Sequence, residues 1–269
     1  MTEDASADPS ADRNADRWAE LGARFVGDHY GSLRGQVRTH VIHQHLRSHL
    51  DPPPKPIVDV GGGAGHQSIP LAMAGYEVTI VDPSPWMLER AAEQAQAAGV
   101  ADRVRLVEAA GEEAPAAVGS ARHAAVLCHG ILMYVDDPVP MLDALAALAA
   151  PDGIVSIVAK NVEVMAVRPA LAGDWSTALA AFDDDRQVNG LGVDTRGDDV
   201  DALSRALQQR GVAPIAWYGV RLFTDGWVPE RPATDPDDLV LAVELEASRR
   251  DPYRRLSRLF HLVGRRGSP

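Results

Sequence analysis

The chain of 269 residues contains a single cysteine, Cys128. It can therefore form neither an intramolecular disulfide nor a zinc site built from several cysteines. The first sixteen residues are polar and acidic and lack the apolar segment of a secretory signal. The longest apolar candidate for a membrane span, residues 139–150, is short and carries Asp143. We expect a cytoplasmic protein that does not contact membranes.

Positive charge is also scarce, since the formal net charge is −12. This argues against binding nucleic acid over the whole surface, because such binding depends on displacing counterions with cationic side chains. A local basic patch is still compatible with the sequence. Its candidates lie near the end of the chain: Arg249, Arg250, Arg254, Arg255, Arg258, Arg265 and Arg266. The simpler interpretation of this run is a solvated helix face followed by a tail.

Aromatic residues are few, at 5%, but an apolar content of 46% can supply a core. Short apolar runs alternate with helical patterns along most of the chain. Strands are predicted at 56–60, 77–81, 104–107, 123–127, 153–159, 213–223 and 259–263. Helices are predicted at 17–29, 32–50, 67–74, 84–98, 138–149, 198–210 and 234–250. This alternation predicts a Rossmann-like, doubly wound α/β fold with a mostly parallel seven-stranded sheet.

The expected organisation is a disordered tail at 1–16 followed by one domain at 17–266. Residues 17–50 would form an N-terminal helical cap. Residues 161–197 interrupt the strand–helix rhythm after the fifth strand and show no strong strand pattern. We expect this segment to be an insertion, partly helical, that lies over the active site.

The strongest local motif is a glycine loop between the first strand and the next helix. It contains Gly61, Gly62, Gly63 and Gly65. Glycine lets the backbone approach a ligand closely, and the following helix offers free N–H groups. Asp82 ends the second strand, where a carboxylate can accept hydrogen bonds from both hydroxyls of a ribose. The simpler alternatives are a tight packing turn for the loop and a turn or N-cap role for Asp82.

The loop favours S-adenosylmethionine (SAM) over a nicotinamide dinucleotide. In the G-x-G-x-x-G fingerprint, Gly61 and Gly63 would be followed by a third glycine where His66 stands. Asp59, just before the loop, suits the ammonium group of a methionine moiety. Residues 108–112 follow the third strand, where the adenine would lie. Over about residues 56–160 the chain resembles class I SAM-dependent methyltransferases. The candidate cofactor-binding residues here are Asp59, Gly61, Gly62, Gly63, Gly65, Asp82, Ala110, Gly111 and Glu112.

Four further segments narrow the resemblance: residues 30–38, residues 128–130, residues 219–223, and residues 251–253 with Phe260 and His261. With them the chain resembles, over about residues 17–266, the bacterial tRNA wobble-uridine methyltransferases. These enzymes esterify the carboxylate of 5-carboxymethoxyuridine. The resemblance implies SAM contacts at Arg38, Gly62, Gly63, Asp82 and His129, with further contacts around Ala110 to Glu112.

The chain also departs from that family. Enteric members carry a basic run in the insertion, where this chain has Asp183, Asp184 and Asp185. Ala64 and His66 replace the usual acidic residue and glutamine. These differences favour an alternative acceptor, a small acid or a natural product. A non-enzymatic protein with a SAM fold is a third hypothesis, against which the intact loop and both aspartates argue. A dehydrogenase is a remote fourth.

A carboxylate acceptor needs no general base, because it is already ionised at neutral pH. Catalysis would then rest on alignment and on excluding water. Arg38 or Arg221 could clamp the carboxylate, and Tyr30 could shape the pocket. Arg221 is equally compatible with a salt bridge at a strand end, and Arg38 with a grip on the SAM carboxylate.

His129 follows a buried strand at the ligand-binding edge of the sheet. It could contact SAM or the acceptor, act as a base for a hydroxyl or amine acceptor, or be a structural histidine. Four histidines cluster between residues 40 and 49, but they lie on more than one helix face and have no recurring acidic partner. We therefore expect no metal.

Overall fold

The computed structural model describes residues 32–119, 122–190, 192–225 and 238–268. Its main feature is a seven-stranded sheet in the order β3-β2-β1-β4-β5-β9-β8. The strands are β1 (Pro56–Val60), β2 (Glu77–Asp82), β3 (Val104–Glu108), β4 (His123–His129), β5 (Ala149–Lys160), β8 (Val212–Val220) and β9 (Leu259–Arg266). Only β9 is reversed in this sheet, running antiparallel to β5 and β8. The predicted Rossmann-like, mostly parallel α/β fold is confirmed.

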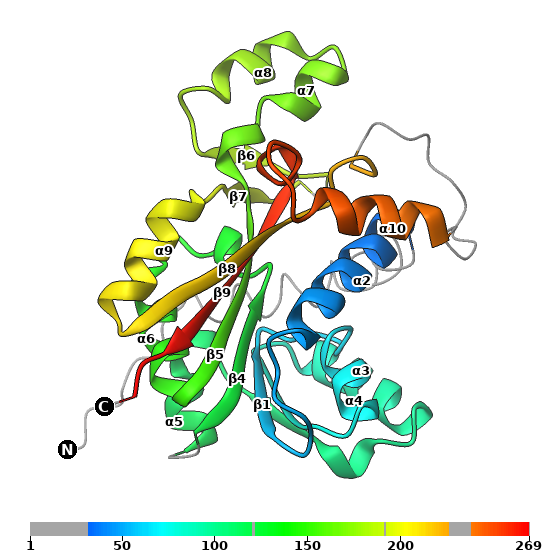
Figure 1. Ribbon diagram of the computed structural model, residues 1–269, viewed down its shortest axis with the longest axis vertical. Helices are drawn as coiled ribbons and strands as arrows, with labels where there is room; N and C mark the ends of the chain where they lie inside the picture. Colours follow the sequence, from blue (N-terminus) through cyan, green and yellow to red (C-terminus); the bar gives the residue numbers. More distant parts are fainter. Residues whose placement is uncertain (1–31, 120–121, 191, 226–237, 269) are drawn as a thin grey trace, which may run out of the picture.

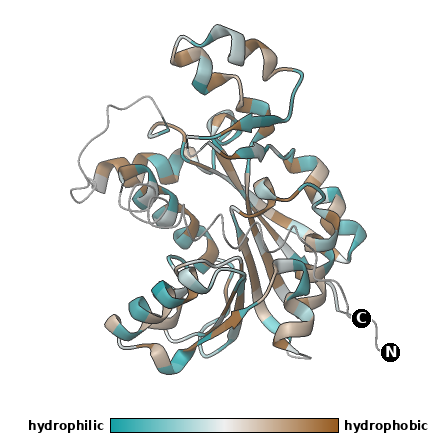
Figure 2. Cartoon of the chain, turned by 180° about the vertical axis from the view of Figure 1, so that it is seen from behind, coloured by the Kyte–Doolittle hydropathy of each residue, from teal (hydrophilic) through white to brown (hydrophobic). Residues whose placement is uncertain are grey.

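Helices cover both faces of the sheet (Figure 1). One face carries α2 (Leu33–Arg47), α3 (Ser68–Met73) and α4 (Pro85–Ala97), with α10 (Asp238–Ala247) against α2. The other carries α5 (Ala114–Val118), α6 (Val139–Leu148) and α9 (Val200–Gln209). Two large apolar clusters fill these two layers, and Figure 2 shows hydrophobic residues along the central strands. Strands covered on both sides read as nearly continuous apolar runs, as they do in this sequence.

Two helix starts follow from their capping residues. The Ser32 hydroxyl accepts a hydrogen bond from the Gly35 backbone N–H, 3.2 Å away, which confirms Ser32 as the N-cap of α2. Ser84 caps α4 by accepting from the Met87 N–H, and Pro85 begins that helix. Because α4 starts immediately after β2, its first turn lies beside Asp82 at the edge of the sheet.

The insertion at 161–197 is partly helical, with α7 (Val167–Leu171) and α8 (Trp175–Ala180) at one end of the molecule (Figure 1). It also forms a small hairpin of β6 (Arg186–Val188) and β7 (Asp194–Arg196) that the sequence pattern did not reveal. Each strand has three residues and is mostly polar, so no alternation of apolar residues marks it. An ion pair across the hairpin between Arg186 and Asp194, 2.7 Å, contributes to its register.

The hairpin is fixed to the body of the domain. Arg196, buried, donates to the carbonyl oxygens of Val135 and Asp136 and pairs with Asp198. Lys160 at the end of β5 donates to the Thr195 hydroxyl, 3.0 Å away. The base of the insertion therefore has a defined position next to the segment that follows β4.

The remaining differences concern element ends. β8 stops at Val220 rather than at 223, because Arg221 takes a left-handed conformation with φ +63° that a strand cannot contain.

The short helix α5 was not predicted, since five residues carry too little periodicity to detect. The predicted tail at 1–16, the predicted helix at 17–29 and residues 234–237 of the last predicted helix lie outside the described residues. None of the helices in the described part of the chain is long and apolar enough to cross a membrane.

Candidate functional site

The glycine loop after β1 lies at the carboxyl edge of the sheet, where open α/β folds bind ligands. The N–H of Gly61 donates to the Val81 carbonyl, 2.7 Å away, which holds the loop against the end of β2. Gly63 has φ +53°, and a Cβ added there would have only Met87 Sδ at 3.8 Å and Asp82 Oδ2 at 3.9 Å near it. The backbone at Gly63 therefore borders open space beside Asp82, as a ligand-binding loop requires.

Asp82 connects the glycine loop to the start of α4. Its Oδ2 accepts from the Gly63 N–H at 2.9 Å, and its Oδ1 accepts from the Ser84 N–H at 3.0 Å. Asp82 thus has the turn role that the sequence analysis gave as the simpler alternative. Each carboxylate oxygen can accept a second hydrogen bond, so a ribose with two hydroxyls can still be held. Burial raises the pKa of Asp82 to about 6, against the lowering effect of the two backbone N–H groups.

Asp59 lies beneath the loop and is fully buried in the sheet layer. Its Oδ2 accepts from the Ser68 hydroxyl at 2.7 Å, whereas Oδ1 has no hydrogen-bond partner among the described residues. Burial raises the pKa of Asp59 to about 6, while Ser68 and the charge of Arg38 oppose the rise. A buried carboxylate with one unpartnered oxygen favours a cationic or N–H-bearing ligand.

The segment that follows β3 completes this edge. Ala110, Gly111 and Glu112 lie at the start of η3 (Gly111–Glu113), and β3 pairs with β2 so that Glu108 is opposite Asp82. A Cβ at Gly111 would come 2.3 Å from the Met141 methyl group, so a larger residue there would have to displace the end of this side chain of α6. Glu112 is exposed. These three residues follow the end of β3 at the same edge of the sheet as Asp82, and their contact with an adenine stays a prediction.

Arg38 projects from α2 to the end of β4. It is buried, and its Nη2 donates to the backbone carbonyl of His129 at 3.0 Å. A Cβ at Gly130 would meet the same nitrogen at 3.1 Å. The charge of Arg38 also contributes to the pKa shifts of Asp59 and His129, so it lies within electrostatic range of the glycine loop. Arg38 and the His129 backbone are thus brought together at the same edge as Asp82.

The ring of His129 faces a different partner. Its Nε2 is 2.8 Å from the Ser156 hydroxyl, which is 2.7 Å from Nε2 of His261. Burial, followed by the charge of Arg38, lowers the pKa of His129 to about 3. A neutral ring with such a low pKa is poorly suited to removing a proton at neutral pH. The geometry therefore favours a structural role for the His129 ring over a general base, with its backbone carbonyl on the ligand side.

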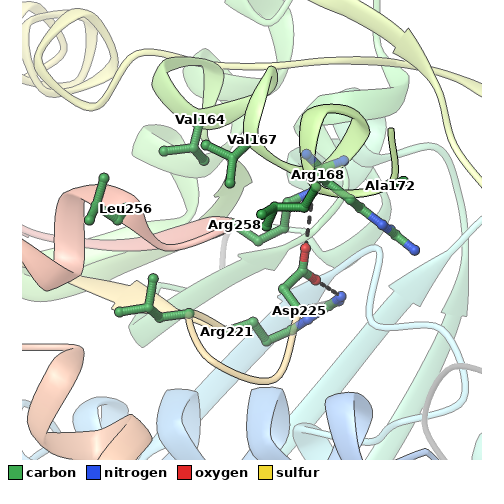
Figure 3. Close-up of a pocket in the computed structure, with 10 residues that line it drawn as sticks. Val164, Val167, Arg168, Ala172, Arg221, Asp225, Leu256 and Arg258 are labelled. Atoms are coloured by element: carbon green, nitrogen blue, oxygen red, sulfur yellow. Dashed lines mark hydrogen bonds and ion pairs between the residues drawn. The ribbon is translucent and has the colours of Figure 1, made fainter. Parts of the chain in front are cut away.

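Arg221 lies in a tight turn just after β8. Its guanidinium Nη2 is hydrogen-bonded to Asp225, and Nε of Arg258 lies 3.8 Å from the other oxygen of the same carboxylate. Figure 3 shows Asp225 between the two arginines. The salt bridge considered for Arg221 is therefore present. Burial lowers the pKa of Arg221, Asp225 opposes that shift, and the charge of Arg38 adds to it.

The turn at 221–225 is held by side chains of two helices, α10 and α2. Buried Glu244 on α10 accepts from the backbone N–H groups of Leu222 and Thr224, at 3.0 and 2.8 Å, and from the Thr224 hydroxyl. Arg34 of α2 donates to the Thr224 carbonyl at 3.2 Å. Together these contacts support the left-handed backbone at Arg221, a conformation that costs a non-glycine residue on the order of 1 kcal/mol.

Replacing Glu244 with alanine should therefore destabilise the protein. The change leaves two backbone N–H groups and a hydroxyl unpartnered, and each buried group left so costs about 1–3 kcal/mol. We expect a loss of about 3 kcal/mol or more in the free energy of unfolding, measured by urea titration. Glu244→Gln, which keeps one acceptor oxygen, should lose less. Equal stability of the alanine variant and the wild type would contradict the buttress role.

The arginines of the basic run near the end of the chain differ in their exposure and in their partners. Arg249, Arg250 and Arg255 are exposed and paired with nearby acids, as the solvated-face interpretation expects. Arg254 stacks over Trp217, with its guanidinium carbon 4.1 Å from the ring centroid. Arg258 departs from that interpretation, because its side chain is only 12% exposed and lies beside Asp225.

Two of the four histidines between residues 40 and 49 make packing contacts with Tyr218. His45 stacks on Tyr218 at 3.6 Å between ring centroids and hydrogen-bonds to Ser248. His49 hydrogen-bonds to the Tyr218 hydroxyl at 2.8 Å. Among the described residues no group of histidine, cysteine and acidic side chains could hold a metal ion.

Sequence reasoning missed four residues of this region, namely Ser68, Asp225, Glu244 and Arg258. Asp225 follows Arg221 by four positions, which is a weak signal outside a helix. Glu244 and Arg258 are distant in sequence and appeared to belong to charged surface. Tyr30, predicted to shape the pocket, lies outside the described residues.

Comparisons with known proteins agree with this geometry. Residues 57–153 match a family described as a methyltransferase domain. The tRNA 5-carboxymethoxyuridine methyltransferase of Escherichia coli (strain K12) is 27% identical over 210 residues, covering 78% of this chain and 79% of that protein. Magnesium protoporphyrin IX methyltransferase from Synechocystis PCC 6803 with bound S-adenosylhomocysteine has a TM-score of 0.63 at 14% identity, covering 96% and 99% of the two chains.

A second solved structure shares the fold over nearly the whole chain. The Burkholderia thailandensis 1,6-didemethyltoxoflavin-N1-methyltransferase with bound S-adenosylhomocysteine has a TM-score of 0.58 at 19% identity, covering 99% and 94%. The domain match shows that residues 57–153 form a methyltransferase domain, and the solved structures show that the chain has the fold of SAM-dependent methyltransferases over nearly its whole length. Within that class it is similar in sequence to the tRNA 5-carboxymethoxyuridine methyltransferase.

The residues at the sheet edge fit SAM. Asp59 has an unpartnered oxygen of the kind that an ammonium group satisfies. Asp82 has acceptor capacity left for ribose hydroxyls, and the space beside Gly63 is open to a ligand. These features are independent of the comparisons and support the same cofactor.

Proposed function

We propose that the protein transfers the methyl group of SAM to the carboxylate of 5-carboxymethoxyuridine in tRNA. The observation that carries the carboxylate acceptor is Arg221, a buried guanidinium whose Nε has no hydrogen-bond partner among the described residues. The charge of Arg38, which donates to the His129 carbonyl at the donor edge, contributes to the lowered pKa of Arg221. The similarity to the E. coli tRNA enzyme supports the tRNA part of the proposal.

The residues would divide the work by position. Asp82 would hold the ribose and Asp59 the ammonium of the cofactor, while the glycine loop lets the backbone approach it. SAM supplies a methyl group bonded to a positively charged sulfur. An oxygen of the acceptor carboxylate forms the new bond to the methyl carbon as the carbon–sulfur bond breaks, and the sulfur keeps the electron pair. No proton moves, so the absence of a suitable base at His129 is consistent with this reaction.

Arg38 and Arg221 would contribute orientation. A guanidinium holds a carboxylate through two parallel N–H donors, which fixes the plane of the acceptor. Holding the oxygen, the methyl carbon and the sulfur in line is the main source of acceleration for such a displacement. A tRNA acceptor would also place the protein in the cytoplasm.

A second acceptor class is favoured by one observation. Asp183, Asp184 and Asp185 are exposed on the insertion, and the chain carries a net charge of −12. Acidic side chains near the site oppose the approach of phosphates. A small carboxylic acid or an acidic natural product would avoid that repulsion while using the same arginines.

The test is methylation of unfractionated tRNA from a strain that lacks the wobble-uridine methyltransferase, followed by nucleoside mass spectrometry. Formation of the methyl ester of 5-carboxymethoxyuridine, dependent on SAM, is the expected result. If tRNA is not methylated although calorimetry shows SAM binding, the tRNA acceptor is wrong. Small carboxylic acids would then be tested as acceptors.

The affinity for SAM should depend on pH through Asp59 and Asp82. Burial raises the pKa of each to about 6, and the cationic cofactor favours the ionised carboxylates. Binding should therefore strengthen as pH rises through 6 and level off near neutral pH. At pH 5 each group is about 90% protonated, so the affinity should fall about tenfold or more below its plateau.

Calorimetry between pH 5 and pH 8 measures this profile. Asp59→Asn removes one titrating group, so its profile should be shallower than that of the wild type, from a lower plateau. An affinity that stays constant from pH 5 to pH 8 would show that neither carboxylate meets the cofactor as proposed.

A further inference from the structure

A cavity of about 170 Å³ lies between the insertion and the turn after β8 (Figure 3). Arg221 and Asp225 come from the turn, Arg258 from the start of β9, and Arg168 from α7 of the insertion. The cavity thus brings together three arginines and one acid from three separate parts of the chain. It is small beside the pockets of about 300–1,000 Å³ that hold drug-sized ligands, so it suits a small head group.

The charges that line this cavity do not cancel. Arg221 is buried and Arg258 is partly buried, with side chains 7% and 12% exposed, and Asp225 is the acid that pairs with both. Among the residues that line the cavity, this inner group has two positive charges and one negative charge, whereas Glu244 does not line the cavity and holds backbone N–H groups of the turn. Arg168, at the exposed rim, adds another positive charge close enough to lower the pKa of Arg258 together with burial. Buried charge without compensation is costly, and one added monoanion would balance the inner group.

Two buried donors of the residues that line the cavity lack partners. Nε of Arg221 and Nη1 of Arg258 are buried and make no hydrogen bond among the described residues. Buried polar atoms are nearly always satisfied in native proteins, and exceptions call for an explanation such as a ligand. Asp225 is hydrogen-bonded to the Arg221 guanidinium and lies 3.8 Å from Nε of Arg258, so one carboxylate holds both arginines at the cavity. Each guanidinium keeps one donor that is not used by a protein acceptor among the described residues.

We propose that this cavity is a binding site for a small oxyanion, held by Arg221 and Arg258 and screened at its rim by Arg168. The inference rests on the proposed function in one respect, that the anion is the carboxylate end of the methyl acceptor. A phosphate group has the same hydrogen-bonding chemistry, and the experiment below distinguishes the two sources.

Other side chains hold the arginines of this cavity in place. Glu244 and Arg34 hold the turn that carries Arg221, and Gln187 of the hairpin lies 3.4 Å from Nη2 of Arg258. A left-handed backbone at a non-glycine residue is a feature that clusters at ligand sites. Donors held in place before binding lose little freedom on binding, which raises affinity for an anion of matching shape.

The apolar part of the wall indicates how the rest of the ligand would lie. Val164 and Val167 of the insertion face the cavity, and Leu256 lies across from them (Figure 3). A small acid with an apolar or planar body fits this combination of charged floor and apolar wall better than a bare inorganic ion does. The insertion would then be the element that selects the acceptor.

Binding without methyl transfer tests the site separately from the proposed function. The full-length protein is titrated calorimetrically, with S-adenosylhomocysteine present, with the nucleoside 5-carboxymethoxyuridine, uridine, and inorganic phosphate. We expect 5-carboxymethoxyuridine to bind and uridine not to bind, with phosphate weak and unable to displace the carboxylate. Phosphate that binds and competes would assign the site to a phosphate group. Binding of neither anion would overturn the proposal.

Two variants connect binding to this cavity. Arg258→Gln removes a buried donor and should weaken binding of the carboxylate by about 30-fold or more, with thermal unfolding as the check on folding. Arg168→Glu reverses an exposed charge, which cannot disturb the core, and should weaken it by about tenfold. The matched control is Arg255→Glu, because Arg255 is exposed and does not line the cavity.

The two proposals can fail separately. Carboxylate binding that depends on Arg258 and Arg168, without methylation of tRNA, keeps the anion site and rejects the tRNA acceptor. If tRNA is methylated and its KM is the same in Arg168→Glu, Arg258→Gln and wild type, the anion site is rejected and the methyl transfer stands.

Discussion

Replacing Asp82 with alanine should weaken SAM binding by at least about 100-fold. The carboxylate holds the Gly63 N–H on one oxygen and the Ser84 N–H on the other, and it retains capacity for two ribose hydroxyls. Hydrogen bonds to a charged group contribute about 1.5–3 kcal/mol each, so losing two ligand contacts removes about 3–6 kcal/mol of binding energy. Calorimetric titration with SAM measures the change directly.

Asp82→Asn is the matched control, because it keeps the size of the side chain and one acceptor oxygen. The amide can still accept from Gly63 or from one hydroxyl, so its affinity should fall between those of the wild type and the alanine variant. Thermal unfolding without ligand separates a damaged loop from a lost contact. An alanine variant with unchanged affinity for SAM would remove Asp82 from the cofactor site.

The donor half of the site was predictable because it is local in sequence. The glycine loop, the aspartate before it and the aspartate that ends the next strand occupy fixed places in one strand–loop–helix–strand unit. Parallel strands bring their carboxyl ends to the same edge, so the sequence order alone places Asp59, Gly63 and Asp82 together. Packing then fixes details such as the Ser68 partner of Asp59, which no pattern indicated.

The acceptor half depends on contacts between distant segments. Arg221, Asp225, Glu244 and Arg258 meet only because β8 and β9 close the sheet and α10 packs against α2. In the sequence Glu244 belongs to an ordinary helix, and Arg258 belongs to a run of arginines that is otherwise exposed. The sequence pattern around a charged residue is the same whether its side chain is solvated or buried against a counterion. Only the fold shows that Arg258 lies beside Asp225 with little exposure, whereas Arg255 is exposed.

His129, the last residue of β4, shows that a strand pattern does not predict the direction of a side chain. Its position at the ligand edge follows from the strand pattern, but the direction of its ring depends on β5 and β9. Ser156 and His261 draw the ring into the sheet, and burial lowers its pKa to about 3. Position along a strand predicted the backbone of His129 at the site, and tertiary hydrogen bonds determined what its side chain can do.

Replacing Arg221 with glutamine should separate acceptor binding from donor binding. The variant loses the guanidinium next to the donor edge, so kcat/KM for the carboxylate acceptor should fall by about 100-fold or more. That range corresponds to about 3 kcal/mol, within the 2–5 kcal/mol that truncating a buried charged donor costs. The affinity for SAM should stay within about threefold, because Asp59, Asp82 and the glycine loop are unchanged. Methylation kinetics and calorimetry on the same preparation give both numbers.

Arg221→Gln also leaves Asp225 without its nearest partner, which could lower stability as well as activity. The double variant Arg221→Gln with Asp225→Asn removes both charges of this pair. It should recover the part of the stability that the single change loses through the unpaired Asp225 carboxylate, although Arg258 then lacks its carboxylate partner. If Arg221 binds the acceptor, activity should stay low in the double variant although that part of the stability returns. If Arg221 serves only to hold the turn, activity and stability should recover together, and the carboxylate clamp would have to be sought at Arg38.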